Sequence, residues 1–214
     1  PHTERQKMMN NQADLEKLRT QIVVASLPHV PFDGWTMKAL RRGATDCGLG
    51  DASALLAFPV SATDAIEYHS RLADKNMVRE AGDLSSLSVR KRVAKAIQCR
   101  LEQNVGHREA IRRACSVLAL PANAPMAARC LYRTVDTIWY MAGDRSSDWN
   151  FYSKRGLLAG IYFATLIYWL DDTSTNTNET WGFLNRRIDN VMQIPMIKQR
   201  ISSFIGKLPR PPQI

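Results

Sequence analysis

The sequence predicts an all-α protein. Apolar residues recur at helical spacings of three and four along nearly the whole chain of 214 residues, and the alternating β-branched runs typical of strands are missing. Apolar residues make up 45% of the chain and charged residues 23%, so wholesale disorder is not expected. This length is enough to bury one sizeable core, around which we expect about ten helices.

The N-terminal third predicts helices separated by turn residues. The first helix is expected over residues 14–27, because Leu15, Leu18 and Ile22 share one face. Pro28 and Gly34 end it. Ser61 and Asp64 resemble a capping box at the start of a later helix. The helices that follow the first are expected at 36–47, 51–58 and 61–80.

The rest of the chain predicts longer helices. Asp148 can cap the N-terminus of an apolar helix that ends at Leu170. Its uncharged run from Gly156 to Leu170 has 15 residues. Because a membrane span needs about 20, we expect a buried helix there. The helices of this part are expected at 88–105, 108–120, 125–141, 148–170, 178–192 and 195–208.

The formal net charge of +9 comes from two stretches. Residues 90–113 hold eight basic and two acidic residues, and residues 186–214 hold six basic residues and one acidic residue. Such an excess points to a polyanionic partner, either nucleic acid or an anionic membrane surface. Solvated helix faces are the alternative, and the stretch 90–113 has no assigned role.

Motifs of catalysis and metal binding are missing. The four cysteines form no C-x-x-C pair, and no H-E-x-x-H, G-x-S-x-G or P-loop occurs. No histidine follows a glutamate by three residues, which excludes the Glu-x-x-His motif of di-iron helix bundles. We therefore assign no catalytic residue, metal ligand or cofactor.

The order of elements near the N-terminus resembles the DNA-binding region of TetR-type repressors. A helix is followed by Pro-Phe-Asp-Gly-Trp35, a short helix, Gly48-Leu-Gly50 and another short helix. Reading base edges requires donors on that last helix. Residues 51–58 contain no Arg, Lys, Asn or Gln, and Asp51 would repel phosphate. We thus expect a degenerate helix-turn-helix and no nucleic-acid partner, with a TetR-type regulator that binds DNA and a hydrophobic ligand as the alternative.

The segment between Trp139 and Arg187 carries a second, more specific resemblance. It contains Trp139-Tyr-Met-Ala-Gly-Asp144, Ser147-Asp-Trp-Asn-Phe-Tyr-Ser-Lys-Arg155, Asp172-Thr-Ser174 and Trp181-x-Phe-Leu184-x-x-Arg187. These motifs resemble the ninth Coq accessory protein family of ubiquinone biosynthesis, and the resemblance extends from about Leu15 to Leu208.

The resemblance implies a non-enzymatic lipid-binding protein with a TetR-like fold. It implies binding of isoprenoid lipids and phospholipid, and presentation of ubiquinone intermediates to the demethoxyubiquinone hydroxylase. It further implies a homodimer that is peripheral to a membrane. That membrane would be the bacterial inner membrane, on its cytoplasmic face, or the mitochondrial inner membrane, on its matrix side.

Residues around the start of the helix at 148–170 are the candidate site. Spacing gathers Phe151, Tyr152 and Arg155 at one helix end, which suits a lipid head group or an aromatic–Arg hot spot for a protein partner. The alternative is an arrangement that only stabilises the helix start. The resemblance implies Arg155 as the head-group contact, and Asp148, Phe151, Tyr152 and Arg155 as the partner interface.

Farther along the same helix, Leu158, Tyr162 and Leu166 are candidates for lining a lipid tunnel. This helix is apolar on every side, which indicates central burial. Periodicity cannot separate a tunnel lining from plain core packing, and the same holds for Trp169.

The last predicted helix has an apolar stripe and a basic face, which suits a membrane interface. The stripe consists of Ile197, Ile201, Phe204, Ile205 and Leu208. A tail helix folded onto the domain or onto a twin subunit is the alternative. The expected segments are a flexible N-terminus (1–13), a helix-turn-helix-like part (14–80), a helical lipid-binding part (81–193), a membrane-binding helix (194–208) and a tail (209–214).

Overall fold

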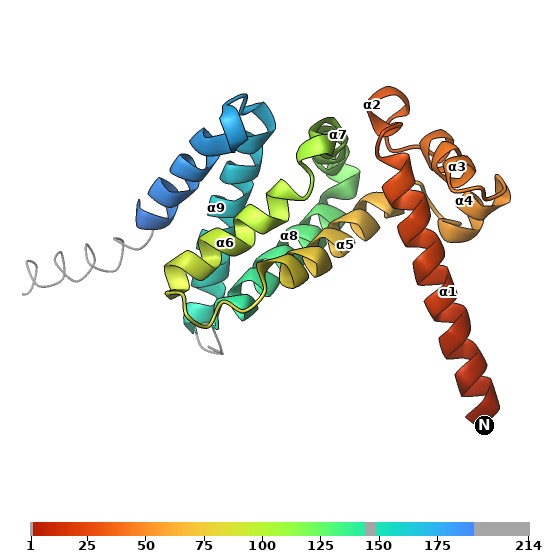
Figure 1. The fold of residues 1–214 in the computed structure, drawn as a ribbon, viewed down its shortest axis with the longest axis horizontal. Coiled ribbons are helices and arrows are strands. Elements are labelled where there is room, and N and C mark those ends of the chain that lie inside the picture. Colours follow the sequence, from red (N-terminus) through yellow and green to blue (C-terminus); the bar gives the residue numbers. More distant parts are fainter. Residues whose placement is uncertain (1, 144–148, 191–214) are drawn as a thin grey trace, which may run out of the picture.

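The computed structural model describes residues 2–143 and 149–190, with side chains from 11 to 143 and from 154 to 190. All regular elements in these ranges are helices, which confirms the all-α class (Figure 1). The α-helices are α1 (His2–Ser26), α2 (Val30–Asp33), α3 (Met37–Asp46), α4 (Ala52–Ala57), α5 (Asp64–Ala81), α6 (Val89–Glu102), α7 (Arg108–Leu118), α8 (Ala124–Met141) and α9 (Trp149–Asp171). Residues 178–190 form a further helix after a 3-10 turn at Thr175–Thr177.

Most helices lie within a few residues of their predicted positions, with three differences at the N-terminal end. α1 begins at His2 instead of residue 14, because no glycine or proline interrupts the chain before Pro28. α2 was not predicted, and a proline in its first turn is compatible with a helix start. α5 begins at Asp64 because the Ser61 hydroxyl accepts a hydrogen bond from the Thr63 amide in a local turn (3.1 Å) instead of forming a capping box.

The N-terminal unit packs α1 closely against α3. The contact centres on Gly43, where a Cβ atom would lie 2.7 Å from the Ser26 amide nitrogen and 2.8 Å from the Ile22 carbonyl oxygen. The absence of a side chain therefore lets the two backbones touch. Ile22, Leu40 and other fully buried side chains of α1, α3 and α4 form the core of this unit.

Helices α5 to α9 form the second part of the molecule. In Figure 1, α5 leaves the N-terminal unit and runs across this bundle, where it packs against α6 and α8. The core of the bundle is a second cluster that includes Met77, Ile97, Ile138 and Leu184. α7 joins the two parts, because the Trp35 indole of the N-terminal unit donates a buried hydrogen bond to the Ala110 carbonyl of α7 (2.9 Å).

The basic stretch 90–113, left without a role by the sequence, holds helices together. Arg92 donates to the carbonyls of Leu87 and Ala142, at 2.8 and 3.2 Å. Arg112 donates to the Leu170 carbonyl at the end of α9 (2.7 Å). These guanidinium groups bridge α6 and α7 to other elements, so the stretch is not simply a solvated helix face.

Candidate functional site

A cavity of about 600 Å³ lies among α5, α6, α7, α8 and α9. Most of its wall is apolar, and small side chains on the facing helices α7 and α8 leave the space open. Ala114 of α7 and Ala127 of α8 are two of these small residues. Clefts of this size and lining bind small apolar molecules.

The cavity opens between α7, α8 and α9. Phe163 and Ile167 of α9 line it although 52% and 42% of their surfaces are exposed. Ser116 and Ala128, on the two facing helices, are also exposed lining residues. An apolar rim of this kind gives an apolar chain a path from the surface into the interior.

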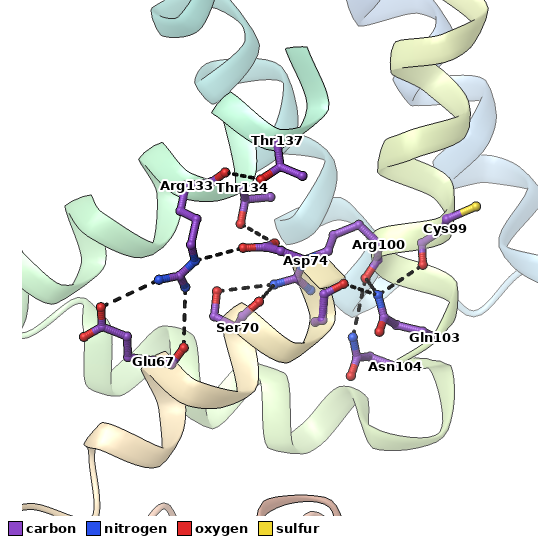
Figure 2. Close-up of polar contacts among 11 residues, drawn as sticks. Glu67, Ser70, Asp74, Cys99, Arg100, Gln103, Asn104, Arg133, Thr134 and Thr137 are labelled. Carbon is purple, nitrogen blue, oxygen red and sulfur yellow. Dashed lines mark hydrogen bonds and ion pairs between the residues drawn. The ribbon is translucent and has the colours of Figure 1, made fainter. Parts of the chain in front are cut away.

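One wall of the cavity is polar and is organised by Asp74 (Figure 2). This buried carboxylate accepts hydrogen bonds from Arg100 Nε (2.9 Å), Thr134 Oγ1 (2.8 Å) and Arg133 Nε (3.1 Å). Arg100 and Thr134 both line the cavity. A single carboxylate on α5 thereby fixes side chains of α6 and α8, because a buried charge requires hydrogen-bonded partners.

Two further titratable groups in the wall are held neutral. Burial, followed by the positive charge of Arg100, lowers the pKa of His69 to about 3. Burial also raises the pKa of the Tyr162 phenol. At neutral pH, His69 and Tyr162 therefore offer hydrogen-bonding groups without charge.

The predicted lining residues of α9 divide between cavity and core. Tyr162 and Leu166 line the cavity. Leu158 is buried in the core of the bundle and does not contribute to the lining. Trp169 lines the cavity as well, so the helix serves both roles that its periodicity left open.

Arg155 lies outside the cavity lining and pairs with Asp136 of α8. Its Nε and Nη2 atoms lie 2.9 and 2.6 Å from Asp136 Oδ1, and the residue is buried. Its predicted companions Asp148, Phe151 and Tyr152 lie outside the described residues and side chains. The partner interface built from these four residues stays a prediction.

The predicted membrane stripe also lies outside the described residues. This applies to Ile197, Ile201, Phe204, Ile205 and Leu208. Of the helices that the structure describes, none combines the length and the apolar character needed to cross a bilayer. Within the same part of the chain, no group of three or more histidine, cysteine, aspartate or glutamate side chains is placed to hold a metal ion.

The motif Asp172-Thr-Ser174 organises the turn after α9. Asp172 accepts hydrogen bonds from the Ser174 and Thr180 amides, at 2.7 and 2.8 Å. Burial alone would raise the pKa of Asp172, but the hydrogen bonds from Ser174 and Thr180 outweigh it and hold this pKa below its usual range. The carboxylate thereby fixes the start of the helix at 178–190.

The polar wall was missed at the level of sequence. His69, Ser70 and Asp74 fall on the face of α5 that also carries buried Ala73 and Met77. Polar residues that interrupt the apolar face of an amphipathic helix are the signal that could have found them. Arg100 was counted only as one charge of a basic stretch.

The described fold belongs to the TetR-like class of helical proteins. A TetR transcriptional regulator from Nitrosomonas europaea superimposes with a TM-score of 0.68, covering 83% of this chain and 99% of that chain at 20% sequence identity. The likeness confirms the predicted TetR-like fold.

Sequence comparison is more specific. Residues 124–195 match the COQ9 family model. The mitochondrial ubiquinone biosynthesis protein COQ9 of Bos taurus is 32% identical over 197 residues, or 88% of this chain and 61% of that protein. The Homo sapiens protein is 30% identical over 88% of this chain and 62% of that protein. The chain thus carries a COQ9 domain and is a homologue of COQ9 proteins, as its motifs predicted, and it spans about three fifths of the length of these relatives.

Proposed function

We propose that this chain is a non-enzymatic lipid-binding accessory protein of ubiquinone biosynthesis. Its relatives are named as ubiquinone biosynthesis proteins. The observation that carries the lipid-binding part is the cavity of about 600 Å³, with a mainly apolar wall and an apolar rim. A volume of this order holds a head group and part of an isoprenoid tail, while the rest of a long tail extends through the opening.

The protein is proposed to work at a membrane surface. The apolar stripe and basic face of residues 194–208 suit reversible docking on an anionic bilayer. The named relatives are mitochondrial, which favours the matrix side of the mitochondrial inner membrane in a eukaryote. In a bacterium, the corresponding place is the cytoplasmic face of the inner membrane.

The bound intermediate is proposed to be presented to the demethoxyubiquinone hydroxylase by a homodimer of this chain. Asp148, Phe151, Tyr152 and Arg155 are the proposed partner interface. The Arg155–Asp136 ion pair supports part of this proposal, because it fixes one of these side chains between α8 and α9. Because Arg155 does not line the cavity, its proposed head-group contact is with a lipid of the membrane surface and not with the molecule whose head group occupies the cavity.

Native mass spectrometry of the gently purified full chain, combined with lipid extraction, tests lipid binding. We expect adducts whose extracts contain isoprenoid or phospholipid. Replacing Ala127 by Trp, a change that fills the cavity near its opening, should reduce the adducts strongly. Ala124→Trp, at an exposed position of α8 outside the cavity lining, is the matched control. A chain that carries no lipid under any condition contradicts the proposal.

A further inference from the structure

In the described part of the chain two buried side-chain nitrogens, Arg108 Nε and Trp169 Nε1, have no hydrogen-bond partner, and of these two residues Trp169 lines the cavity. Trp169 is 0% exposed and lines the cavity near the end of α9. Its indole Nε1 has no hydrogen-bond partner in the described part of the chain. Leaving a buried N–H unpaired is costly, so such a group needs an explanation.

The other tryptophans with described side chains show how this fold normally satisfies an indole. Trp35, Trp139 and Trp181 each donate to a backbone carbonyl, namely those of Ala110, Lys154 and Asn176. These donor–acceptor distances are 2.9 to 3.2 Å. Trp169 is the exception among these four, and it is also the one of the four that lines the cavity.

Two arginines donate to backbone carbonyls that follow Trp169 in the chain. Arg112 donates to the Leu170 carbonyl and Arg108 donates to the Asp172 carbonyl. The Arg108 guanidinium also lies over the Trp169 ring, 4.8 Å from its centroid. A guanidinium only donates hydrogen bonds, so it cannot satisfy the indole, and its positive charge favours an oxygen with partial negative charge nearby.

Trp169 shares its face of α9 with two other residues that line the cavity. Leu166 and Tyr162 precede it by three and seven residues, so all three lie on the same face of the helix. All three line the cavity.

We propose that the Trp169 indole N–H donates a hydrogen bond to a carbonyl oxygen of the lipid in the cavity. The occupant is therefore an amphiphile with its carbonyl-bearing end beside Trp169, and not a bare hydrocarbon. This inference rests on the proposed lipid-binding function. A prenylated quinone and a diacyl phospholipid both supply the required carbonyl oxygen.

Nuclear magnetic resonance of the full chain with 15N-labelled tryptophan tests the proposal. The probes are a short-tailed prenylated benzoquinone, a short-chain diacyl phosphatidylcholine and an acyclic terpene hydrocarbon. The Trp169 indole resonance, assigned through Trp169→Phe, should move downfield with at least one carbonyl-bearing probe but not with the hydrocarbon. The carbonyl-bearing probe that shifts the resonance identifies the ligand class.

Affinity measurements on variants give a second readout. Trp169→Phe should weaken binding of the carbonyl-bearing probe about fivefold to tenfold, the effect of one lost hydrogen bond, and leave hydrocarbon binding unchanged. Trp181→Phe, outside the cavity lining, is the matched control. The resonance is followed in the unmutated chain, so it decides the question even if Trp169→Phe folds poorly, with assignment then taken from through-space contacts to Leu166.

The outcomes separate this inference from the proposed function. An equal resonance shift with the hydrocarbon, or an equal loss of affinity for all probes in Trp169→Phe, overturns the hydrogen bond but leaves lipid binding intact. Carbonyl-bearing probes that bind without moving the resonance also overturn the hydrogen bond and leave lipid binding intact. Failure of every probe to bind the unmutated chain overturns both the proposed function and this inference.

Discussion

At the scale of single residues, one carboxylate holds the polar wall of the cavity together. Asp74 is 4% exposed and receives donors from Arg100, Arg133 and Thr134. Arg100 is itself buried, so each of the two charges depends on the other for compensation. The ion pair thereby holds the Arg100 guanidinium in place in the cavity wall.

We predict that Asp74→Ala destabilises the protein by about 3–5 kcal/mol, because it leaves Arg100 buried without its counter-charge. Urea unfolding measures the change. Glu80→Ala is the control, since Glu80 forms an exposed pair with its neighbour Arg79 and should cost at most about 1 kcal/mol. Equal effects of the two substitutions would contradict the role assigned to Asp74.

His69 predicts a pH dependence of stability. The folded state holds its pKa at about 3, below the ordinary value of 6.5, so between these values the unfolded chain binds the proton and the folded chain does not. The stability that His69 contributes to the folded state is fully present above pH 6.5. It is lost as the pH falls towards 3, at about 1.4 kcal/mol per pH unit. Unfolding free energies of the wild type and His69→Gln between pH 6.5 and 4 should differ in slope by that amount. Parallel curves would contradict the low pKa of His69.

At the scale of elements, backbone approach sets the geometry of the N-terminal unit. α1 and α3 meet at Gly43 with no room for a Cβ atom. The neighbouring atoms are backbone atoms of Ile22 and Ser26, which cannot rotate away. The packing of these two helices therefore depends on this glycine, whereas an added Cβ at Gly156 or Gly160 of α9 would meet nothing within 4 Å.

Two glycine-to-alanine substitutions should consequently have opposite effects on the stability of the protein. Gly43→Ala should destabilise the protein by about 1–3 kcal/mol through overpacking. Gly160→Ala in α9, where an added Cβ meets nothing within 4 Å, should stabilise it by about 0.5–1 kcal/mol because alanine favours a helix. Thermal unfolding of both variants checks the pair, and a stabilised Gly43→Ala would refute the close approach.

At the scale of the whole molecule, the fold is TetR-like, but α4, which stands at the position of the DNA-reading helix, lacks the side chains that read DNA. α4 exposes Leu55 and Leu56, by 46% and 67%, where a DNA-reading helix would present donors. Of the basic residues of α3, Lys38 and Arg42 both pair with Asp33. A gel-shift assay that showed specific nanomolar DNA binding would favour the regulator alternative over lipid delivery.

The basic face and apolar stripe of residues 194–208 predict that this segment attaches the protein to a membrane. Removing residues 195–214 should abolish flotation with anionic liposomes, because the apolar stripe and four basic side chains are removed with this segment. A chain that carries Lys198→Glu, Arg200→Glu and Lys207→Glu should float less but retain its apolar contacts. Undiminished flotation of the truncated chain would refute the membrane role of this segment.

Much of the molecule follows from local patterns in the sequence. Helical spacing and proline and glycine breaks placed the helices, and the motifs between Trp139 and Arg187 predicted the COQ9 relationship. The sequence also identified Tyr162 and Leu166 as candidate lining residues, and both line the cavity. These features depend on short-range geometry, which a sequence records directly.

The tertiary structure alone decided which part of α9 borders the cavity. Leu158 and Tyr162 lie four residues apart on one face and both belong to the core cluster, yet only Tyr162 also lines the space left by small residues on α7 and α8. The partners of Asp74 lie 26 to 60 residues away along the chain. Periodicity shows that a side chain is buried but not what faces it, because burial depends on the arrangement of distant helices.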